Sequence, residues 1–225
     1  MKITSIIKNW IPAFAGMTVL LAFAGMMALA ADAPNPPITF LSQEEIAPHQ
    51  KTIDRIQEYL TGLTTIVSDF TQVAPDGSLT SGKFFLGRPG KMRWQYNPPT
   101  PILMVSNGDE MIYYDYELEQ LSHIPLDQTL IGFLAQNPIS FDKTVGLTGF
   151  SQSADVIRIS LAQLGKPEDG ELTLEFSDKP LAIRNMVIRD AQHQVTTVSL
   201  NNAQFDVKLN PKLFDFRDPR EDRRK

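Results

Sequence analysis

Short segments rich in β-branched and aromatic residues recur from residue 65 to residue 207, separated about every eight to twelve residues by Gly, Pro, Asn or Asp. This rhythm predicts an antiparallel meander, and Asn107-Gly108 is its clearest hairpin turn because both residues tolerate a positive φ. We expect eleven strands, at Thr65–Val73, Ser81–Leu86, Lys91–Tyr96, Pro101–Ser106, Glu110–Tyr114, Gln120–Ile124, Gly149–Ser153, Val156–Leu161, Glu171–Ser177, Ala182–Asp190 and Gln194–Val207.

Several of these segments alternate between apolar and polar side chains, as in Met92, Trp94 and Tyr96 against their charged and amide neighbours. Each such strand has one apolar face. Eleven strands with almost no intervening helix imply a strongly curved sheet or partial barrel, whose inner face needs a plug or a ligand. The expected fold is therefore mainly β (α+β), an incomplete antiparallel β-barrel with a lid of short helices.

Two helical segments are available to cover the open mouth of such a barrel. From His49 to Leu63, apolar residues recur at three- and four-residue spacing, which predicts an amphipathic helix. From Asp127 to Asn137, a short apolar segment lies between Pro125 and Pro138 and also predicts a helix.

The first thirty residues have the features of an export signal. Lys2 and Lys8 precede an uncharged apolar run that ends in Ala28-Leu29-Ala30. We expect residues 1–30 to be a cleaved signal peptide and the protein to be periplasmic. The run is also long enough to span a bilayer, so a retained N-terminal anchor is the alternative.

The remaining chain divides into a proline-rich, flexible lead-in at 31–47, a β domain at 48–216 and a charged C-terminal tail at 217–225 that we expect to be disordered. The formal net charge of −5 argues against nucleic acid as a partner. The chain contains no cysteine, so we expect no disulfide, no thiolate metal site and no lipid anchor on a cysteine.

Motifs that carry chemistry are missing from the sequence. It contains no nucleophile elbow, phosphate-binding glycine loop or paired-histidine motif, and its three histidines are far apart. The carboxylates fall beside glycines and prolines, where solvated turns are expected. We therefore predict a protein that is not an enzyme and has no cofactor, catalytic residue or metal site.

One stretch of the sequence carries a family resemblance. It runs from Phe70-Thr71-Gln72 through Gly82, Phe84 and Leu86 to RPGKMRWQYNPPTP at 88–101, VSNGDEMIYYDYELEQL at 105–121 and LNPKLFDF at 209–216. Over residues 50–216, the chain resembles the periplasmic outer-membrane lipoprotein carrier family of the LolA type. The resemblance implies a lidded hydrophobic cavity in a monomeric carrier. Such a carrier takes acylated lipoproteins from an inner-membrane lipoprotein-releasing transporter and passes them to an outer-membrane lipoprotein receptor.

The resemblance also implies individual roles. Arg88 matches an arginine that holds the empty carrier closed through hydrogen bonds to the lid backbone, although on sequence alone it could be a solvated turn residue. Met92 aligns with a position at the cavity rim that is often aromatic in the family, and it could equally fill core space. We expect the acyl-chain cavity and lid to comprise Arg88, Met92, Trp94, Tyr96, Leu103, Val105, Met111, Tyr113, Leu130, Phe133 and Leu134.

Two other functions remain open at this point. A related β-cup that carries another lipid or a glycolipid would need the same apolar cavity, because the cavity argument specifies chains and no head group. A regulatory module for envelope stress could use the same fold to bind protein, and an appended second domain would favour it.

Overall fold

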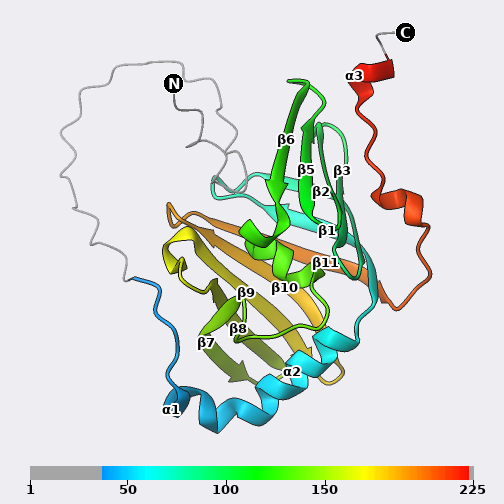
Figure 1. Ribbon diagram of the computed structural model, residues 1–225. Coiled ribbons are helices and arrows are strands. Elements are labelled where there is room, and N and C mark those ends of the chain that lie inside the picture. Colours follow the sequence, from blue (N-terminus) through cyan, green and yellow to red (C-terminus); the bar gives the residue numbers. More distant parts are fainter. Residues whose placement is uncertain (1–36, 223–225) are drawn as a thin grey trace, which may run out of the picture.

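The computed structural model describes residues 37–222 and contains one antiparallel sheet of eleven strands (Figure 1). All eleven predicted strands are present, which confirms the expected fold class. They are β1 Thr65–Val73, β2 Leu79–Gly87, β3 Lys91–Tyr96, β4 Ile102–Asn107, β5 Glu110–Asp115, β6 Gln120–Pro125, β7 Val145–Ser153, β8 Val156–Gln163, β9 Gly170–Asp178, β10 Leu181–Asp190 and β11 Val195–Phe205.

The strand order is β6-β5-β4-β3-β2-β1-β11-β10-β9-β8-β7. Two meanders, β1 to β6 and β7 to β11, are therefore joined where the first strand pairs with the last. The strands β6 and β7 are the two edges and do not pair with each other, so the barrel is incomplete. The hairpin at Asn107-Gly108 joins β4 to β5 as expected, with positive φ at Gly108 alone of the two residues.

The helices are short apart from one. They are α1 Gln43–Ile46, η1 Ala47–His49, α2 Gln50–Gly62, η2 Leu126–Gln128, η3 Leu130–Ala135, η4 Pro167–Asp169, η5 Pro211–Phe214 and α3 Pro219–Asp222. The amphipathic helix predicted from the spacing at 49–63 is α2, which buries Ile53, Ile56 and Leu60. None of the helices in the described part of the chain is long and apolar enough to cross a membrane.

The segment expected to form one helix at 127–137 forms two 3₁₀ turns instead, η2 and η3. Thr129 separates them, because its backbone is extended while its hydroxyl donates to the Leu126 carbonyl and accepts from Gly132 N. A Cβ at Gly132 would lie 2.0 Å from the Leu126 carbonyl oxygen, so this tight turn depends on glycine.

Both ends of the described chain are more ordered than the sequence suggested. Ser42 and Glu45 form a reciprocal capping box that starts α1 inside the expected flexible lead-in. Just before it, Leu41 N donates to the Leu147 carbonyl at the β7 edge. In the expected disordered tail, α3 forms at 219–222. The predicted signal peptide lies outside the described residues.

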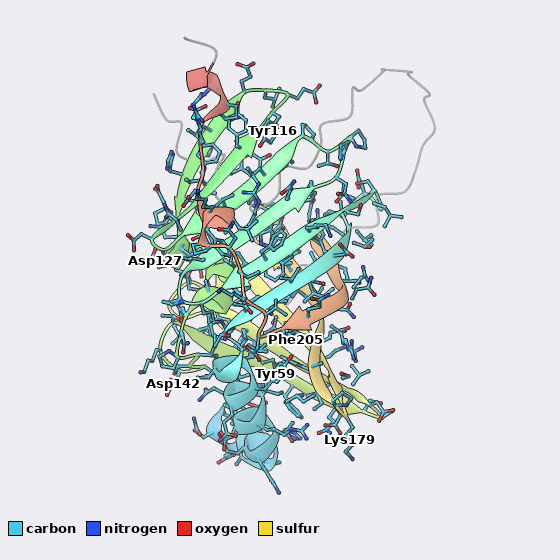
Figure 2. All side chains as sticks on the ribbon, turned by 90° about the vertical axis from the view of Figure 1, so that its right-hand side faces the viewer. Tyr59, Tyr116, Asp127, Asp142, Lys179 and Phe205 are labelled. Carbon is cyan, nitrogen blue, oxygen red and sulfur yellow. The ribbon has the colours of Figure 1, made fainter. Side chains whose placement is uncertain are left out.

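The two faces of the sheet differ in what covers them. The concave face packs against α2 and η3 in one apolar core. On the outer face of β3 to β5, the C-terminal segment 209–216 crosses the strands (Figure 2). Arg93 donates to the Leu213 carbonyl at 3.1 Å, and the ring of Phe216 lies 5.7 Å from that of Tyr114. We call residues 209–216 the C-terminal strap.

Candidate functional site

One half of the concave face, towards the β6 edge, is a wall of large apolar side chains from β3, β4 and β5. In the antiparallel register Trp94 lies opposite Met104, and Met104 lies opposite Tyr113, so all three point to the same face. Met92 and Met111 lie on that face through their shared partner Ser106. Because methionine side chains are flexible and polarisable, this wall can adapt to apolar ligands of different shape.

An aromatic cluster continues this wall from β3 across β2 to β1. The Trp94 ring lies 4.1 Å from that of Phe84 and 5.1 Å from that of Phe70, and Phe70 also meets Tyr96 edge-on at 5.1 Å. The Tyr96 hydroxyl donates to Gln72 Oε1 at 2.7 Å. Burial raises the pKa of Tyr96, and it raises that of Tyr113 to about 12, so both hydroxyls stay neutral.

Two residues expected in the cavity do not lie on this face. Leu103 pairs with Gln95 and Val105 pairs with Arg93, so both point to the outer side of the sheet. They are buried nonetheless, because the C-terminal strap covers the outer side of β3 to β5. Their assignment to the cavity was wrong: β4 is apolar on both faces, and its sequence pattern therefore could not distinguish them.

The lid consists of η3 and α2, which come from distant parts of the chain. Phe133 and Leu134 of η3 are buried in the same apolar core as the wall, Leu130 packs against that core, and η3 lies beside β9. Ala135 at the end of η3 accepts a 2.8 Å hydrogen bond from Gly90 N in the β2–β3 turn. The three predicted lid residues therefore belong to the core that the concave face also helps to form.

The helix α2 is anchored to the opposite half of the sheet. Its Tyr59 hydroxyl accepts from Ile183 N at 3.2 Å, and Arg55 forms an ion pair with Asp178. Burial is the main cause of the raised pKa of Tyr59. At the other end of the lid, Thr61 Oγ1 accepts from Ile139 N at 3.3 Å, which ties α2 to the loop after η3.

Arg88 joins the two lid elements. Its Nε donates to the Leu134 carbonyl of η3 at 2.7 Å, while Nη1 donates to the carbonyls of Leu60 in α2 and, at 3.2 Å, Leu63. Burial lowers the pKa of Arg88 to about 10, which still leaves it cationic at neutral pH. Arg88 is therefore not a solvated turn residue. It is a partly buried cation that spans three backbone carbonyls.

The concave face is closed in this structure. Met92, Trp94 and Met111 are at most 2% exposed, because wall and lid side chains fill the interior. Access for a ligand thus requires the lid to move. Sequence reasoning also missed two residues beside the wall, Phe70 and Phe84. Phe70 stands between two polar residues in β1, which would have marked it as inward-facing, but Phe84 is followed by Phe85, so alternation could not have placed it beside Trp94.

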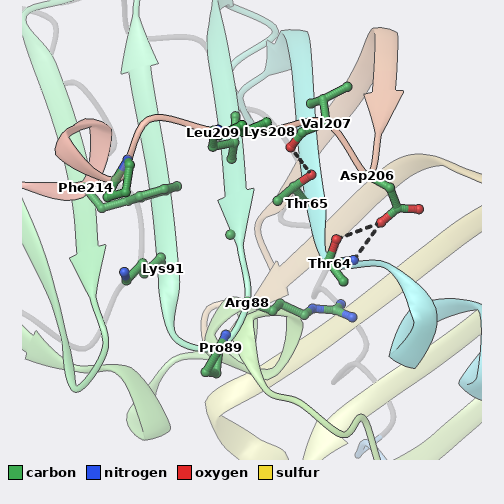
Figure 3. A pocket seen from close by; sticks show the side chains of 12 residues that line it. Thr64, Thr65, Arg88, Pro89, Lys91, Asp206, Val207, Lys208, Leu209 and Phe214 are labelled. Carbon is green, nitrogen blue, oxygen red and sulfur yellow. Dashed lines mark hydrogen bonds between the residues drawn. The ribbon is translucent and has the colours of Figure 1, made fainter.

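A cleft of about 450 Å³ lies elsewhere, between the start of β1, the β2–β3 turn and the chain after β11 (Figure 3). Asp206 accepts hydrogen bonds from Thr64 N and Oγ1, both at 2.9 Å, and Thr65 Oγ1 donates to the Val207 carbonyl. The lining residues are Thr64, Thr65, Gly87, Arg88, Pro89, Lys91, Asp206, Val207, Lys208, Leu209, Pro211 and Phe214. This mixed surface is unlike the apolar wall.

The polar groups of residues 37–222 do not form a metal centre, since no three or more His, Cys, Asp or Glu side chains are grouped there. His49 stacks on Phe150 with ring centroids 4.2 Å apart, and His123 pairs with Glu110 at 2.9 Å. These two histidines are thus accounted for by structural contacts.

Comparison with known proteins gives the following matches. A family model described as outer membrane lipoprotein carrier protein LolA matches residues 61–217. An outer-membrane lipoprotein carrier protein of Methylococcus capsulatus is 30% identical over 192 residues, 80% of this chain and 88% of that protein. One from Alkalilimnicola ehrlichii is 26% identical over 220 residues, 90% of this chain and 94% of that protein. The crystal structure of a LolA superfamily protein from Nitrosomonas europaea aligns with a TM-score of 0.41 at 12% identity, covering 72% of this chain and 97% of that one.

Proposed function

Since this chain belongs to the outer membrane lipoprotein carrier protein LolA family, we propose that it carries acylated lipoproteins from the inner to the outer membrane. The acyl chains bind along the concave wall of β3 to β5, and α2 and η3 move aside to admit them. One observation carries the proposal: Arg88 donates hydrogen bonds to the carbonyls of Leu134 and Leu60 and so holds both lid elements over an apolar wall.

The wall residues of this proposal are those that share the concave face. We assign to the ligand site Met92, Trp94, Tyr96, Met104, Met111 and Tyr113 on the sheet, with Arg88, Leu130, Phe133 and Leu134 in the lid and its latch. Leu103 and Val105 are not included. No covalent chemistry is part of this function, so the protein acts by binding alone.

The energetics explain why carriage needs a lidded protein. Each buried methylene contributes about 0.8 kcal/mol, and a triacylated lipid has on the order of forty, which gives a gross transfer free energy of about 30 kcal/mol. A lipoprotein would therefore almost never leave a membrane unaided. Loading is driven by an energy-consuming inner-membrane transporter, and an outer-membrane receptor of greater affinity unloads the carrier.

The carrier works as a soluble monomer in the periplasm, after removal of residues 1–30. The positively charged start and the Ala28-Leu29-Ala30 sequence support this part of the proposal. N-terminal sequencing of the protein recovered from cells tests it. A start near Ala31 in the periplasmic fraction is expected, whereas an intact Met1 in membranes would make the protein a tethered carrier.

The function itself is tested in two steps. Addition of the purified protein to inner-membrane vesicles with the energised transporter should release lipoproteins into solution, and release without the protein should be far smaller. Mass spectrometry of ligands co-purified from the periplasm then identifies the cargo. Acylated peptides support the proposal, while free phospholipid or glycolipid alone would assign the chain to another kind of lipid carriage.

A further inference from the structure

The indole of Trp94 is almost fully enclosed within the concave wall. It is 2% exposed and lies between the rings of Phe84 and Phe70, with Met104 opposite on β4. Its Nε1–H is buried and has no hydrogen-bond acceptor in the described part of the chain. An apolar wall thus contains one unpaired donor.

An unpaired donor at this position is unusual. A buried tryptophan N–H usually has a hydrogen-bond partner. Leaving a buried donor unpaired costs more free energy than a typical hydrogen bond contributes to stability. Phenylalanine would give the wall an aromatic ring without that cost. The donor therefore calls for an acceptor that is absent from the closed, empty chain.

Two hydroxyl groups on the same face are already paired within the chain. The Tyr96 hydroxyl, two residues along the same face, donates to Gln72 Oε1, and the Ser106 hydroxyl donates to the Gly90 carbonyl at 2.7 Å. A second unpaired buried atom, Thr80 Oγ1, lies on the same face of β2, where Thr80 pairs with Gln72. Among the described residues, unmet hydrogen-bonding capacity is therefore found at Trp94 Nε1 and Thr80 Oγ1 on the concave side, and at Arg88 Nη2 beside the lid.

We propose that Trp94 Nε1 donates a hydrogen bond to a carbonyl oxygen of the bound acyl group, an ester or an amide, once the lid has opened. This inference rests on the proposed lipid carriage and adds a chemical preference to it. The wall then distinguishes acyl chains, which have a carbonyl at one end, from alkyl chains of the same length, which do not. Trp94 is thereby a specificity-determining residue within a surface that is otherwise selective only for apolarity.

The test uses two ligands that differ by one carbonyl group, 1-O-palmitoylglycerol and 1-O-hexadecylglycerol. Each displaces a fluorescent hydrophobic probe from the purified protein. We expect the wild type to bind the ester about tenfold more tightly than the ether, the scale of one buried hydrogen bond. In Trp94→Phe this ratio should fall to about one.

A matched control removes an unpaired polar atom on the other face of the sheet. Tyr114 is buried and its hydroxyl has no partner among residues 37–222, but it lies on the outer face opposite Leu103 and near Phe216. Tyr114→Phe should retain the tenfold ratio. If it abolishes the ratio as Trp94→Phe does, the preference arises from general loosening of the fold and the inference is wrong.

A direct readout is available because the sequence has two tryptophans, and Trp10 lies within the predicted signal peptide that the mature carrier lacks. In the chain that begins near Ala31, the single ¹⁵N-indole resonance reports on Trp94 Nε1–H. It should move downfield with the ester and not with the ether.

The outcomes separate the two levels of proposal. Equal displacement by both ligands, with an indole resonance that does not respond to the carbonyl, leaves lipid carriage standing but overturns the inference. Failure of both ligands to displace the probe would instead contradict the proposed carriage.

Discussion

The Nε of Arg88 lies 2.7 Å from the carbonyl oxygen of Leu134, a residue 46 positions later in the chain. This contact joins the β2–β3 turn to η3, and Nη1 of the same side chain reaches the carbonyls at the end of α2. One side chain thereby connects both lid elements to the sheet. The cost of placing a cation there is offset only while those carbonyls remain in place.

Replacement of Arg88 by leucine should favour the open lid by about 1 to 3 kcal/mol, the scale of a lost charged hydrogen bond. Lipoprotein would still load, but an open apolar wall holds cargo more favourably, so transfer to the receptor should stall. The measurement is the loaded fraction of wild-type and Arg88→Leu protein recovered from cells.

Two controls accompany this change. Arg88→Lys should rescue poorly, because an ammonium cannot reproduce the planar fork that reaches several carbonyls. Arg93→Leu removes a neighbouring arginine that bonds the Leu213 carbonyl on the outer face, and it should leave the loaded fraction unchanged. Equal loaded fractions in wild type and Arg88→Leu would contradict the role of Arg88 in holding the lid closed.

Substitutions at two neighbouring residues of β5 should distinguish an effect on ligand binding from an effect on stability. Met111 lies on the concave face and Ile112 on the outer face opposite Val105, and both are buried. Truncation of either to alanine should lower the free energy of unfolding by about 2 to 5 kcal/mol. Only Met111→Ala should also change the affinity for a hydrophobic probe, measured well below the unfolding temperature. An equal change in Ile112→Ala would mean that the ligand does not bind on the concave face.

Glycine at position 82 is required by close packing. A Cβ there would lie 2.2 Å from the Gln95 carbonyl oxygen and 2.7 Å from Phe70 Cε1. Gly82→Ala should therefore destabilise the fold by about 1 to 3 kcal/mol in urea unfolding. Gly62→Ala is the matched control, because nothing lies within 4 Å of its Cβ and alanine favours the end of α2, so it should be neutral or slightly stabilising.

Acid should weaken the junction between α2 and the chain after β11. Hydrogen bonds from Thr64, chiefly from its backbone N–H, lower the pKa of Asp206. A depressed folded-state pKa gives stability that is present above the unfolded value near 4 and is lost as the pH falls through the folded value. The stability difference between wild type and Asp206→Asn should thus be larger at pH 7 than at pH 2. A difference that is independent of pH would show that the carboxylate charge does not matter.

Much of the fold follows from local sequence pattern. Alternation in segments such as Lys91–Tyr96 and the turn at Asn107-Gly108 predicted all eleven strands, because a half-buried strand must alternate and a tight hairpin needs particular residues. The three-four spacing in 50–62 predicted α2 for the same kind of reason. These signals depend on residues close together in the chain, and sequence alone is sufficient to read them.

Only the tertiary structure decided which face of a strand that is apolar on both sides belongs to the concave wall. Leu103 and Met104 lie on opposite faces of β4, and both are buried because the C-terminal strap covers one face and the lid covers the other. Likewise, the three carbonyls that Arg88 contacts come from α2, the residue after it and η3, and no local pattern brings them together. Periodicity gives two faces to every strand, but what covers each face is set by contacts between segments far apart in sequence.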